Sequence, residues 1–177
     1  MLSTTSLGRP IVYLDSAASA QKPQPVLDAM QAYYTGSYAN IHRGVYQASE
    51  QASLAYDGTR VTVAEFLGGV SPEEIVFVRG TTEAINLVAQ AWLRPTLRAD
   101  DWVLVSEMEH HANIVPWQLV GARTVPIPLT DAGTLDLEAA ARLLADRPRL
   151  LAVTHASNAL GTINPIAELA AMARSNG

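Results

Sequence analysis

The sequence predicts an α/β protein with a mostly parallel sheet flanked by helices. From residue 75 onward, short apolar runs alternate with segments of helical periodicity. The apolar runs, such as 102–105 and 150–154, are continuous rather than alternating, as expected for strands buried on both faces of a parallel sheet. Ligands of such sheets bind outside the carboxyl ends of the strands, so the polar residues at those ends are the candidate site.

The predicted elements follow one another along the chain. Before the alternating region we expect a strand or extended arm at 11–14, a loop of small residues at 15–20, a helix from 23–25 to about 34, a loop at 36–44, and a helix at about 48–67 that stops at Gly68-Gly69. In the alternating region we expect strands at 75–78, 102–105, 123–128 and 150–154, with helices from 81, between 113 and 123, at 135–145, and from 165 onward.

The composition argues against several classes of protein. With 177 residues, 49% of them hydrophobic and 16% charged, the chain has the length of one domain with a sizeable core. A net charge of −5 and a pI near 5.3 argue against nucleic acid or anionic lipid as partners. There is no cysteine, no secretory leader pattern in residues 1–9, and no apolar run of about 18 residues, so we expect no disulfide, no membrane span and a cytoplasmic location.

The turn at residues 79–82 has the chemistry of an anion site. Gly80 allows a close approach of the backbone, and the first N–H groups of the following helix have no intrahelical acceptors. The hydroxyls of Thr81 and Thr82 lie beside this positive end of the helix dipole. The pattern is not a P-loop, so the phosphate of a nucleotide is disfavoured, whereas the phosphate of a smaller cofactor stays open. An ordinary helix start, with a threonine N-cap and Glu83 in the first turn, is the plainer interpretation.

Two further strand ends carry polar side chains. Glu109-His110-His111 follows strand 102–105, but adjacent histidines point in different directions and no third ligand has a suitable spacing, so a metal site is disfavoured. One of these histidines could stack on a flat cofactor and pass protons, or simply cap the next helix. Asn158 could be an ordinary turn residue or donate a hydrogen bond to a phenolate-like oxygen.

Five blocks of sequence together resemble the group II cysteine desulfurases, which are pyridoxal-phosphate enzymes of the class V aminotransferase superfamily. In chain order the blocks are Leu14-Asp15-Ser16-Ala17-Ala18, His42-Arg43-Gly44, residues 79–89, residues 109–117, and Ser157-Asn158-Ala159-Leu160-Gly161. The resemblance runs from about residue 11 to the end of the chain. It implies the fold of the first half of the large domain of a fold type I pyridoxal-phosphate-dependent transferase.

The resemblance also implies roles for individual residues. Thr81 and Thr82 match the phosphate-binding turn, and His110 matches the catalytic histidine that stacks on the pyridine ring and transfers protons. Asn158 matches the residue near the phenolic oxygen of the cofactor and the substrate carboxylate. The segments that line the substrate entrance are matched by Ala17, Ala18, His42 and Arg43.

The implied reaction converts L-cysteine to L-alanine and passes sulfur as a persulfide to an acceptor protein, for iron–sulfur cluster assembly, in a homodimeric enzyme. It requires a lysine that binds the cofactor, an acid beside the ring nitrogen and a cysteine that takes the sulfur. The family's Asp, Lys and Cys lie beyond the position that matches Gly177, and the only lysine, Lys22, lies outside the motifs. We therefore expect the chain alone to be inactive. The alternatives are a selenocysteine lyase, another class V lyase or epimerase, and a non-catalytic remnant or binding module.

Two expectations concern the organisation of the chain. Residues 1–46 are expected to form an N-terminal arm with the substrate-entrance segment, and residues 47–177 the first half of the cofactor-binding domain. Between Trp117 and Pro128 the chain is several residues shorter than the family pattern, which predicts a shortened helix there. The final helix ends in Asn176-Gly177 and would normally lead into another strand, so we expect the sequence to be part of a longer protein.

Overall fold

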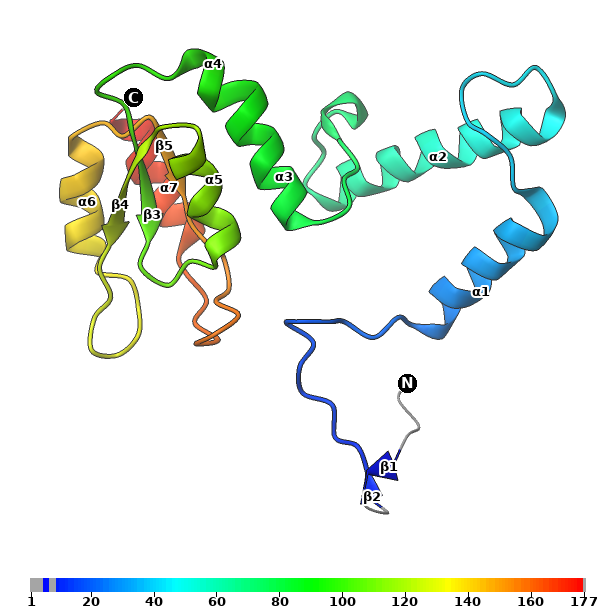
Figure 1. Cartoon of the computed structure of the whole chain (residues 1–177), viewed down its shortest axis with the longest axis horizontal. Coiled ribbons are helices and arrows are strands. Elements are labelled where there is room, and N and C mark those ends of the chain that lie inside the picture. Colours follow the sequence, from blue (N-terminus) through cyan, green and yellow to red (C-terminus); the bar gives the residue numbers. More distant parts are fainter. Residues whose placement is uncertain (1–4, 7–8, 177) are drawn as a thin grey trace. The chain divides into compact units, whose positions relative to one another are not determined.

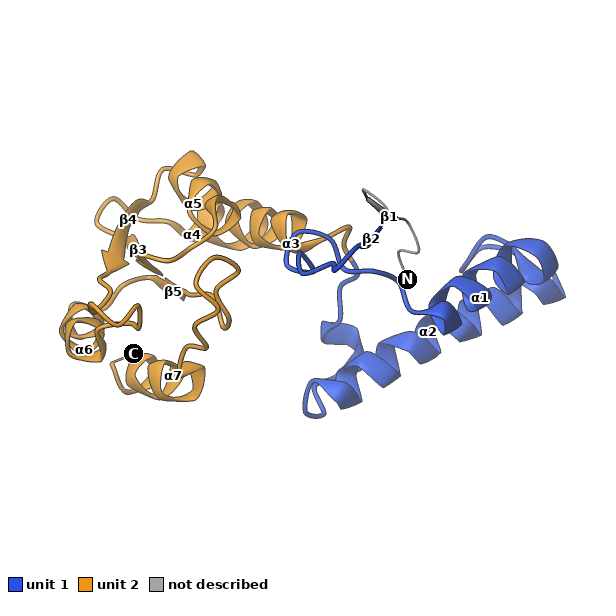
Figure 2. Ribbon diagram, turned by 90° about the horizontal axis from the view of Figure 1, so that it is seen from below, with its two compact units in different colours: residues 1–77 blue, residues 78–177 orange. Residues whose placement is uncertain are grey.

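The computed structural model describes residues 5–6 and 9–176 of the chain. They belong to two compact units, residues 1–77 and 78–177, which Figure 2 shows in blue and orange. The predicted division between residues 46 and 47 concerns the organisation of a complete enzyme and stays a prediction. Within the described residues, no helix combines the length and the apolar character needed to cross a lipid bilayer.

Unit 1 is built mainly from two helices. Its elements are the antiparallel strands β1 (Thr5–Ser6) and β2 (Arg9–Pro10), helix α1 (Gln24–Ala32), the π-helical turn η1 (Tyr33–Ser37), helix α2 (Gln47–Phe66) and the 3₁₀ turn η2 (Pro72–Glu74) (Figure 1). Both helices lie where the sequence predicts them, and residues 11–14 form an arm that pairs with no described strand. The predicted loop between the helices is also present.

Helix α2 ends at a pair of glycines, as predicted. Gly68 (φ 96°) and Gly69 (φ 82°) both adopt left-handed backbone conformations, which side chains with a Cβ rarely tolerate. The N–H of Gly69 donates to the carbonyl of Ala64 at 2.9 Å and satisfies one of the last carbonyls of the helix. The chain then turns at Ser71, whose N–H donates to the carboxylate of Glu74 at 2.8 Å in a capping box.

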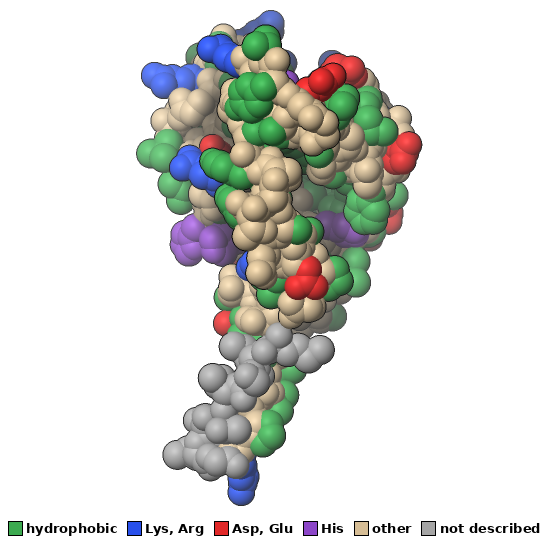
Figure 3. Space-filling model, turned by 90° about the vertical axis from the view of Figure 1, so that its right-hand side faces the viewer, with side chains coloured by type: hydrophobic (Ala, Val, Ile, Leu, Met, Phe, Trp, Pro, Cys, Tyr) green, Lys and Arg blue, Asp and Glu red, His purple; other side chains and the backbone are tan. Residues whose placement is uncertain are grey.

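Unit 1 has almost no hydrophobic core among its described residues. Its buried hydrophobic side chains there are Ala52, Ala64 and Ile75. Val26 and Met30, on α1, are about half exposed. Hydrophobic side chains, drawn green in Figure 3, therefore reach the surface. Monomeric soluble proteins rarely expose this much hydrophobic surface.

The prediction of a strand at residues 75–78 is wrong. These residues follow η2 without regular secondary structure, and among the described strands none pairs with them. Ile75 is buried, whereas Val76, Phe77 and Val78 are exposed. A strand is defined by hydrogen bonds to a neighbour, so β propensity alone cannot create one where no partner strand lies alongside.

Unit 2 contains a three-stranded parallel sheet of order β4-β3-β5. Its strands are β3 (Trp102–Ser106), β4 (Arg123–Ile127) and β5 (Leu150–Ala152). The register pairs Leu104 with Val125 on one side and with Leu151 on the other. Every residue of the central strand β3 is buried, which is why its apolar run is continuous. The parallel sheet predicted from the sequence is therefore confirmed.

Helices cover both faces of the sheet. They are α3 (Thr81–Val88), continued by the π-helical turn η3 (Ala89–Leu93) and α4 (Arg94–Thr96), the 3₁₀ turn η4 (His111–Asn113), α5 (Val115–Leu119), α6 (Leu137–Ala145) and α7 (Ile166–Ser175) (Figure 1). Trp102 and Leu104 pack with residues of α6 and α7 in one core cluster, whereas Val103 and Val105 pack with residues of η3 and α5 in the other. Alternate side chains of β3 thus serve opposite faces.

The connection between β3 and β4 is short. Its helix α5 has 5 residues and begins after the η4 turn. Whether it is shortened relative to the family pattern stays a prediction. Trp117 nevertheless anchors it, because this side chain is buried and its Nε1 donates to the carbonyl of Asn113 at 2.9 Å. The short helix therefore still holds the η4 turn, and with it the segment after His110, on the sheet.

Candidate cofactor site at the carboxyl ends of the strands

The polar segments that follow β3 and β5 lie at the same edge of the sheet in unit 2. His110 follows β3 and Asn158 follows β5, and these strands are adjacent and parallel. Helix α3, which begins at Thr81, packs against the η4 turn that follows His110. The fold thus places the helix with the threonines against the first of the two strand-end segments, at the edge where ligands of parallel sheets bind.

Helix α3 begins with backbone donors that have no acceptor. Gly80 (φ 164°, ψ 176°) is its N-cap, so the plainer interpretation of a threonine N-cap is wrong. Among the described residues no backbone carbonyl accepts from the N–H of Thr81 or Thr82, and both threonines are exposed. Exposed hydroxyls beside free N–H groups at a helix start suit an anion.

The glycine at position 80 has no explanation within the chain. Its backbone is extended, a conformation open to any residue, and a Cβ added there would meet no atom of the described residues within 4 Å. Neither backbone strain nor packing therefore requires Gly80. Its missing side chain leaves open space at the start of the helix, next in the chain to the residues with free N–H groups, which suits a ligand that approaches the backbone closely.

An ion pair flanks the start of α3. The carboxylate of Glu83 accepts from the N–H of Arg79 at 2.7 Å and from its Nε at 2.9 Å. The side-chain hydrogen bond from Arg79, and then the backbone one, lower the pKa of Glu83 below its ordinary value. Glu83 is therefore ionised at neutral pH and engages Arg79. The first N–H groups of the helix stay free for another anion.

His110 caps the η4 turn, which was the plainer of its two predicted roles. Its Nδ1 accepts a hydrogen bond from the N–H of Ala112 at 3.1 Å. The ring of His111 stands edge-on to it, with centroids 6.1 Å apart. Both imidazoles are exposed. The cap fixes the orientation of the His110 ring without covering its faces, so the predicted stacking role is compatible with this geometry and stays a prediction.

Asn158 lies in a tight turn at the tip of a closed loop. The loop is closed by the antiparallel bridge between Ala156 and Ile163 and by a hydrogen bond of 2.9 Å from the N–H of Ser157 to the carbonyl of Thr162. The buried Ser157 side chain accepts from the N–H of Leu160 at 3.1 Å. The side chain of Asn158 itself is exposed. Its turn conformation fits the simpler prediction, and the proposed contact with a phenolic oxygen stays a prediction.

The sequence places Glu109 in the polar segment after β3 but predicts no role for it, and the structure supplies one. Glu109 is half-buried between β3 and η4, and its carboxylate accepts hydrogen bonds from Ser106 Oγ at 2.5 Å, Asn113 Nδ2 at 2.9 Å and the N–H of Thr154 at 2.6 Å. The last bond joins residues 45 positions apart. This hydrogen bond depends on the adjacency of β3 and β5, so the local sequence around Glu109 does not predict Thr154 as its partner.

The four predicted substrate-entrance residues belong to unit 1. Ala17 and Ala18 are exposed in a turn in which the N–H of Ala18 donates to the carbonyl of Asp15 at 3.2 Å. His42 has a left-handed backbone (φ 67°), donates from its N–H to Ser53 Oγ at 2.8 Å, and packs edge-on against the Tyr56 ring. Arg43, next to it, is exposed. The common role of these four residues at a substrate entrance stays a prediction.

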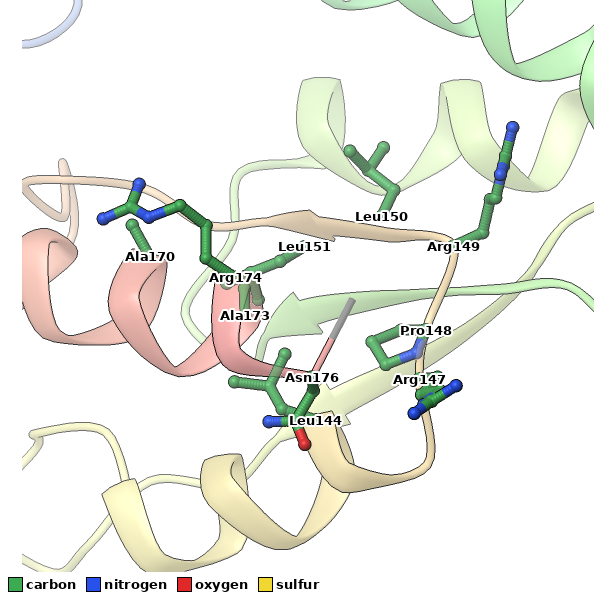
Figure 4. A pocket seen from close by; sticks show the side chains of 10 residues that line it. All are labelled: Leu144, Arg147, Pro148, Arg149, Leu150, Leu151, Ala170, Ala173, Arg174 and Asn176. Carbon is green, nitrogen blue, oxygen red and sulfur yellow. The ribbon is translucent and has the colours of Figure 1, made fainter.

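A cavity in unit 2 lies away from these strand ends. It is lined by the C-terminal ends of α6 and α7 and by the start of β5, and so it lies at the amino end of that strand (Figure 4). Arg147, Arg149 and Arg174 line it, but their side chains point in different directions (Figure 4). Among the described residues no three His, Asp or Glu side chains are grouped so that they could hold a metal ion.

Comparison with known proteins identifies a family and several relatives. The family model described as Aminotransferase class-V matches residues 12–177. A cysteine desulfurase of Salmonella typhimurium (strain LT2) is 53% identical over 174 residues, which cover 96% of this chain and 43% of that protein. The apo structure of a cysteine desulfurase from Thermococcus onnurineus NA1 superposes with a TM-score of 0.88 at 38% identity, over 94% of this chain and 42% of that one. A structure of SspA in complex with cysteine gives a TM-score of 0.78 at 26% identity, over 92% and 47% of the two chains.

The fold and the polar strand ends define an α/β protein with a parallel sheet and a candidate site at the carboxyl edge of that sheet. The chain belongs to the aminotransferase class-V family. Its structural relatives include cysteine desulfurases, and their similarity confirms the predicted fold class. The chain spans less than half the length of the relatives described above.

Proposed function

We propose that this chain forms the phosphate- and ring-binding part of a pyridoxal-phosphate-dependent cysteine desulfurase, which converts L-cysteine to L-alanine and transfers the sulfur as a persulfide. The observation that carries the proposal is the start of α3, where Gly80 opens space beside free N–H groups and two exposed threonines. A phosphate dianion matches these donors. The choice of L-cysteine is supported by the relatives, two of which are cysteine desulfurases while a third binds cysteine in its structure.

The residues present fit this cofactor, and each has a proposed task. Thr81 and Thr82 hold the phosphate with their hydroxyls and N–H groups. His110 stacks on the ring and exchanges protons at Nε2, because its Nδ1 is occupied by the N–H of Ala112. Asn158 donates its side-chain amide to the phenolic oxygen and the substrate carboxylate. The bound cofactor supplies the electron sink that the reaction needs. Ala17, Ala18, His42 and Arg43 line the substrate entrance.

We expect the 177-residue chain alone to be inactive. It contains no cysteine to take up sulfur. Its only lysine, Lys22, lies in the arm of unit 1, where the Nζ donates to the carbonyl of Ala20 at 3.0 Å. Covalent catalysis of this kind needs both a lysine at the cofactor and a nucleophilic thiol. Formation of alanine from L-cysteine by the purified chain would contradict this expectation.

The resemblance to cysteine desulfurases supports further proposals about the cellular setting. The complete enzyme acts as a homodimer in the cytoplasm. It delivers sulfur to an acceptor protein for iron–sulfur cluster assembly. Residues 1–46 serve it as the arm and entrance segment, and residues 47–177 as the first half of the cofactor domain.

The test is a titration of the purified chain with pyridoxal phosphate, monitored by calorimetry. Lys22→Arg is introduced first, because it removes the only lysine that could react with the aldehyde. Replacing Thr81 and Thr82 together by valine removes two hydroxyl donors, which we expect to weaken binding by roughly tenfold or more at about 1 kcal/mol for each hydrogen bond. Pyridoxal, which lacks the phosphate, should bind weakly to both proteins.

A matched threonine provides the control. Thr59 is exposed on α2 and its hydroxyl donates to the carbonyl of Ala55 at 2.9 Å. Thr59→Val should leave the affinity for pyridoxal phosphate unchanged. Equal affinities for the cofactor in the Thr81/Thr82 double variant and in the parent protein would refute the proposed phosphate site.

A further inference from the structure

Glu109 connects three segments at the carboxyl edge of the sheet. Its Oε1 accepts from Ser106 Oγ, at the last residue of β3, and from the N–H of Thr154, just beyond β5. Its Oε2 accepts from Asn113 Nδ2 in η4. His110 is the next residue in the chain. One half-buried carboxylate thus ties the segment of His110 to the strand that leads into the loop of Asn158.

A carboxylate suits the partners of Glu109 better than a glutamine amide. All three groups that face it are donors, namely a hydroxyl, an amide NH₂ and a backbone N–H. An ionised carboxylate offers acceptor sites on both oxygens, whereas a glutamine offers them on only one. Hydrogen bonds to a charged acceptor are also stronger than those between neutral groups. Glutamine can keep the two bonds to Oε1 but would turn its own NH₂ toward Asn113.

The loop of Asn158 is held from the other side as well. The carbonyl of Thr154 accepts from Nδ2 of the buried Asn164 at 2.8 Å, while its N–H is bound to Glu109. The N–H of Asn164 in turn donates to the carbonyl of His155 at 2.8 Å. Both backbone groups of Thr154 are therefore held by side chains at the point where the strand ladder stops. The position of Thr154 depends on Glu109 from the side of His110.

We propose that Glu109 is the positioning residue of the cofactor site, an inference that rests on the proposed function. Glu109 touches neither substrate nor cofactor. It sets the segment of His110, which faces the ring, relative to the loop of Asn158, which faces the phenolic oxygen. Removal of its carboxylate loosens the connection between the two segments, which then rests on the contact of Asn164 Nδ2 with Met108 Sδ at 3.4 Å, while the sheet below them stays intact.

The test compares Glu109→Ala and Glu109→Gln with the parent chain by NMR. We expect Glu109→Ala to accelerate hydrogen exchange of the Thr154 amide by roughly ten- to a hundredfold, as the loss of a charged hydrogen bond predicts. The ring signals of His110 and the side-chain amide signals of Asn158 should shift together. Amides of Val103 and Leu104 should keep their exchange rates, which distinguishes positioning from general loss of stability. Glu109→Gln should retain protection of Thr154 within about threefold, because one oxygen still accepts.

Glu107→Gln is the matched control. Glu107 lies in the same turn, but its carboxylate is exposed and accepts from the N–H of Leu129, beyond β4. The Glu107→Gln substitution should leave the signals of His110 and Asn158 unchanged. If Glu109→Ala does not fold, the loss of the Asn113 contact in Glu109→Gln, with shifted His110 signals, still supports the inference.

Calorimetry with pyridoxal phosphate separates the two proposals. We expect Glu109→Ala to weaken binding by about tenfold, the equivalent of one lost hydrogen bond in the site. A parent chain that does not bind the cofactor would overturn the proposed function, although coupled shifts of His110 and Asn158 would still establish Glu109 as the link between them. Unchanged His110 and Asn158 signals, with unchanged cofactor affinity, in both Glu109 variants would overturn the inference.

Discussion

The N–H of Ala112 donates a hydrogen bond to Nδ1 of His110 at 3.1 Å. A nitrogen that accepts a hydrogen bond carries no proton, so a neutral His110 ring must carry its proton on Nε2. The cap of a three-residue turn thereby selects the tautomer of an exposed imidazole. The atom left to exchange protons is the one that points away from the backbone.

The tautomer of His110 can be measured directly. Long-range ¹H–¹⁵N spectra of the neutral imidazole should show the pattern of an Nε2–H ring for His110. Substitution by asparagine should largely preserve the cap, whereas His110→Ala should destabilise the protein by about 1 kcal/mol, as for other lost N-caps. An Nδ1–H pattern for His110 would contradict the hydrogen bond to Ala112.

Gly80→Ala should separate ligand binding from folding. The new methyl group has open space, and the extended backbone accepts alanine, so we expect the free energy of unfolding to stay within about 1 kcal/mol. If the ligand approaches the backbone of residue 80 closely, the methyl group obstructs it, and the affinity for pyridoxal phosphate should fall at least about tenfold. Gly58→Ala, which adds a methyl group to equally open space on α2, should not change the affinity. A Gly80→Ala protein that binds the cofactor normally would argue against the close approach.

The start of α3 should respond to acid. Arg79 lowers the pKa of Glu83 in the folded chain, first through its side chain and then through its N–H. The contribution of Glu83 to stability is therefore fully present above the ordinary glutamate pKa of about 4.3 and is lost as the pH falls through the lower folded-state pKa. The amide signals of Arg79 and Thr81 should move over that acidic range. In Glu83→Gln the same signals should not titrate there, and a titration near neutral pH in the parent chain would contradict the assignment.

Leu104 should be among the most sensitive core positions. Its side chain is fully buried at the centre of β3, so Leu104→Ala should lower the free energy of unfolding by about 2–5 kcal/mol. Leu119→Ala, at an exposed residue of α5, should change it by less than about 0.5 kcal/mol. Urea unfolding followed by tryptophan fluorescence provides both values. Similar losses for the two variants would mean that the sheet of unit 2 is not the stabilising core.

Elements whose signal is local could be predicted from the sequence. The continuous apolar run of β3 and the glycine stop after α2 are examples, because burial on both faces and left-handed backbone each demand particular residues. The segment 75–78 has strong β propensity, yet it forms no strand. Its outcome depends on a partner strand elsewhere, which local sequence does not specify.

The candidate site shows the same division. Thr81, His110 and Asn158 were found because each follows a strand or turn signal, and the family pattern then assigned their roles. The role of Glu109 could not be predicted because it depends on the hydrogen bond from Thr154. The fold brings these two residues together at the ends of the adjacent strands β3 and β5. The choice of Gly80 as N-cap was missed because two threonines stand next to it, and residue type alone does not distinguish threonine from glycine at this position.

The two-sided packing of β3 constrains how the protein can change over time. Trp102 and Leu104 fill one layer, and Val103 and Val105 fill the other. A slip of the strand by a single residue would exchange the large and small side chains between the layers. An insertion inside the strand would therefore disrupt both layers of the core. Substitutions in the loops beyond Ser106 and Ala152 can change the chemistry at the edge of the sheet without disturbing that core.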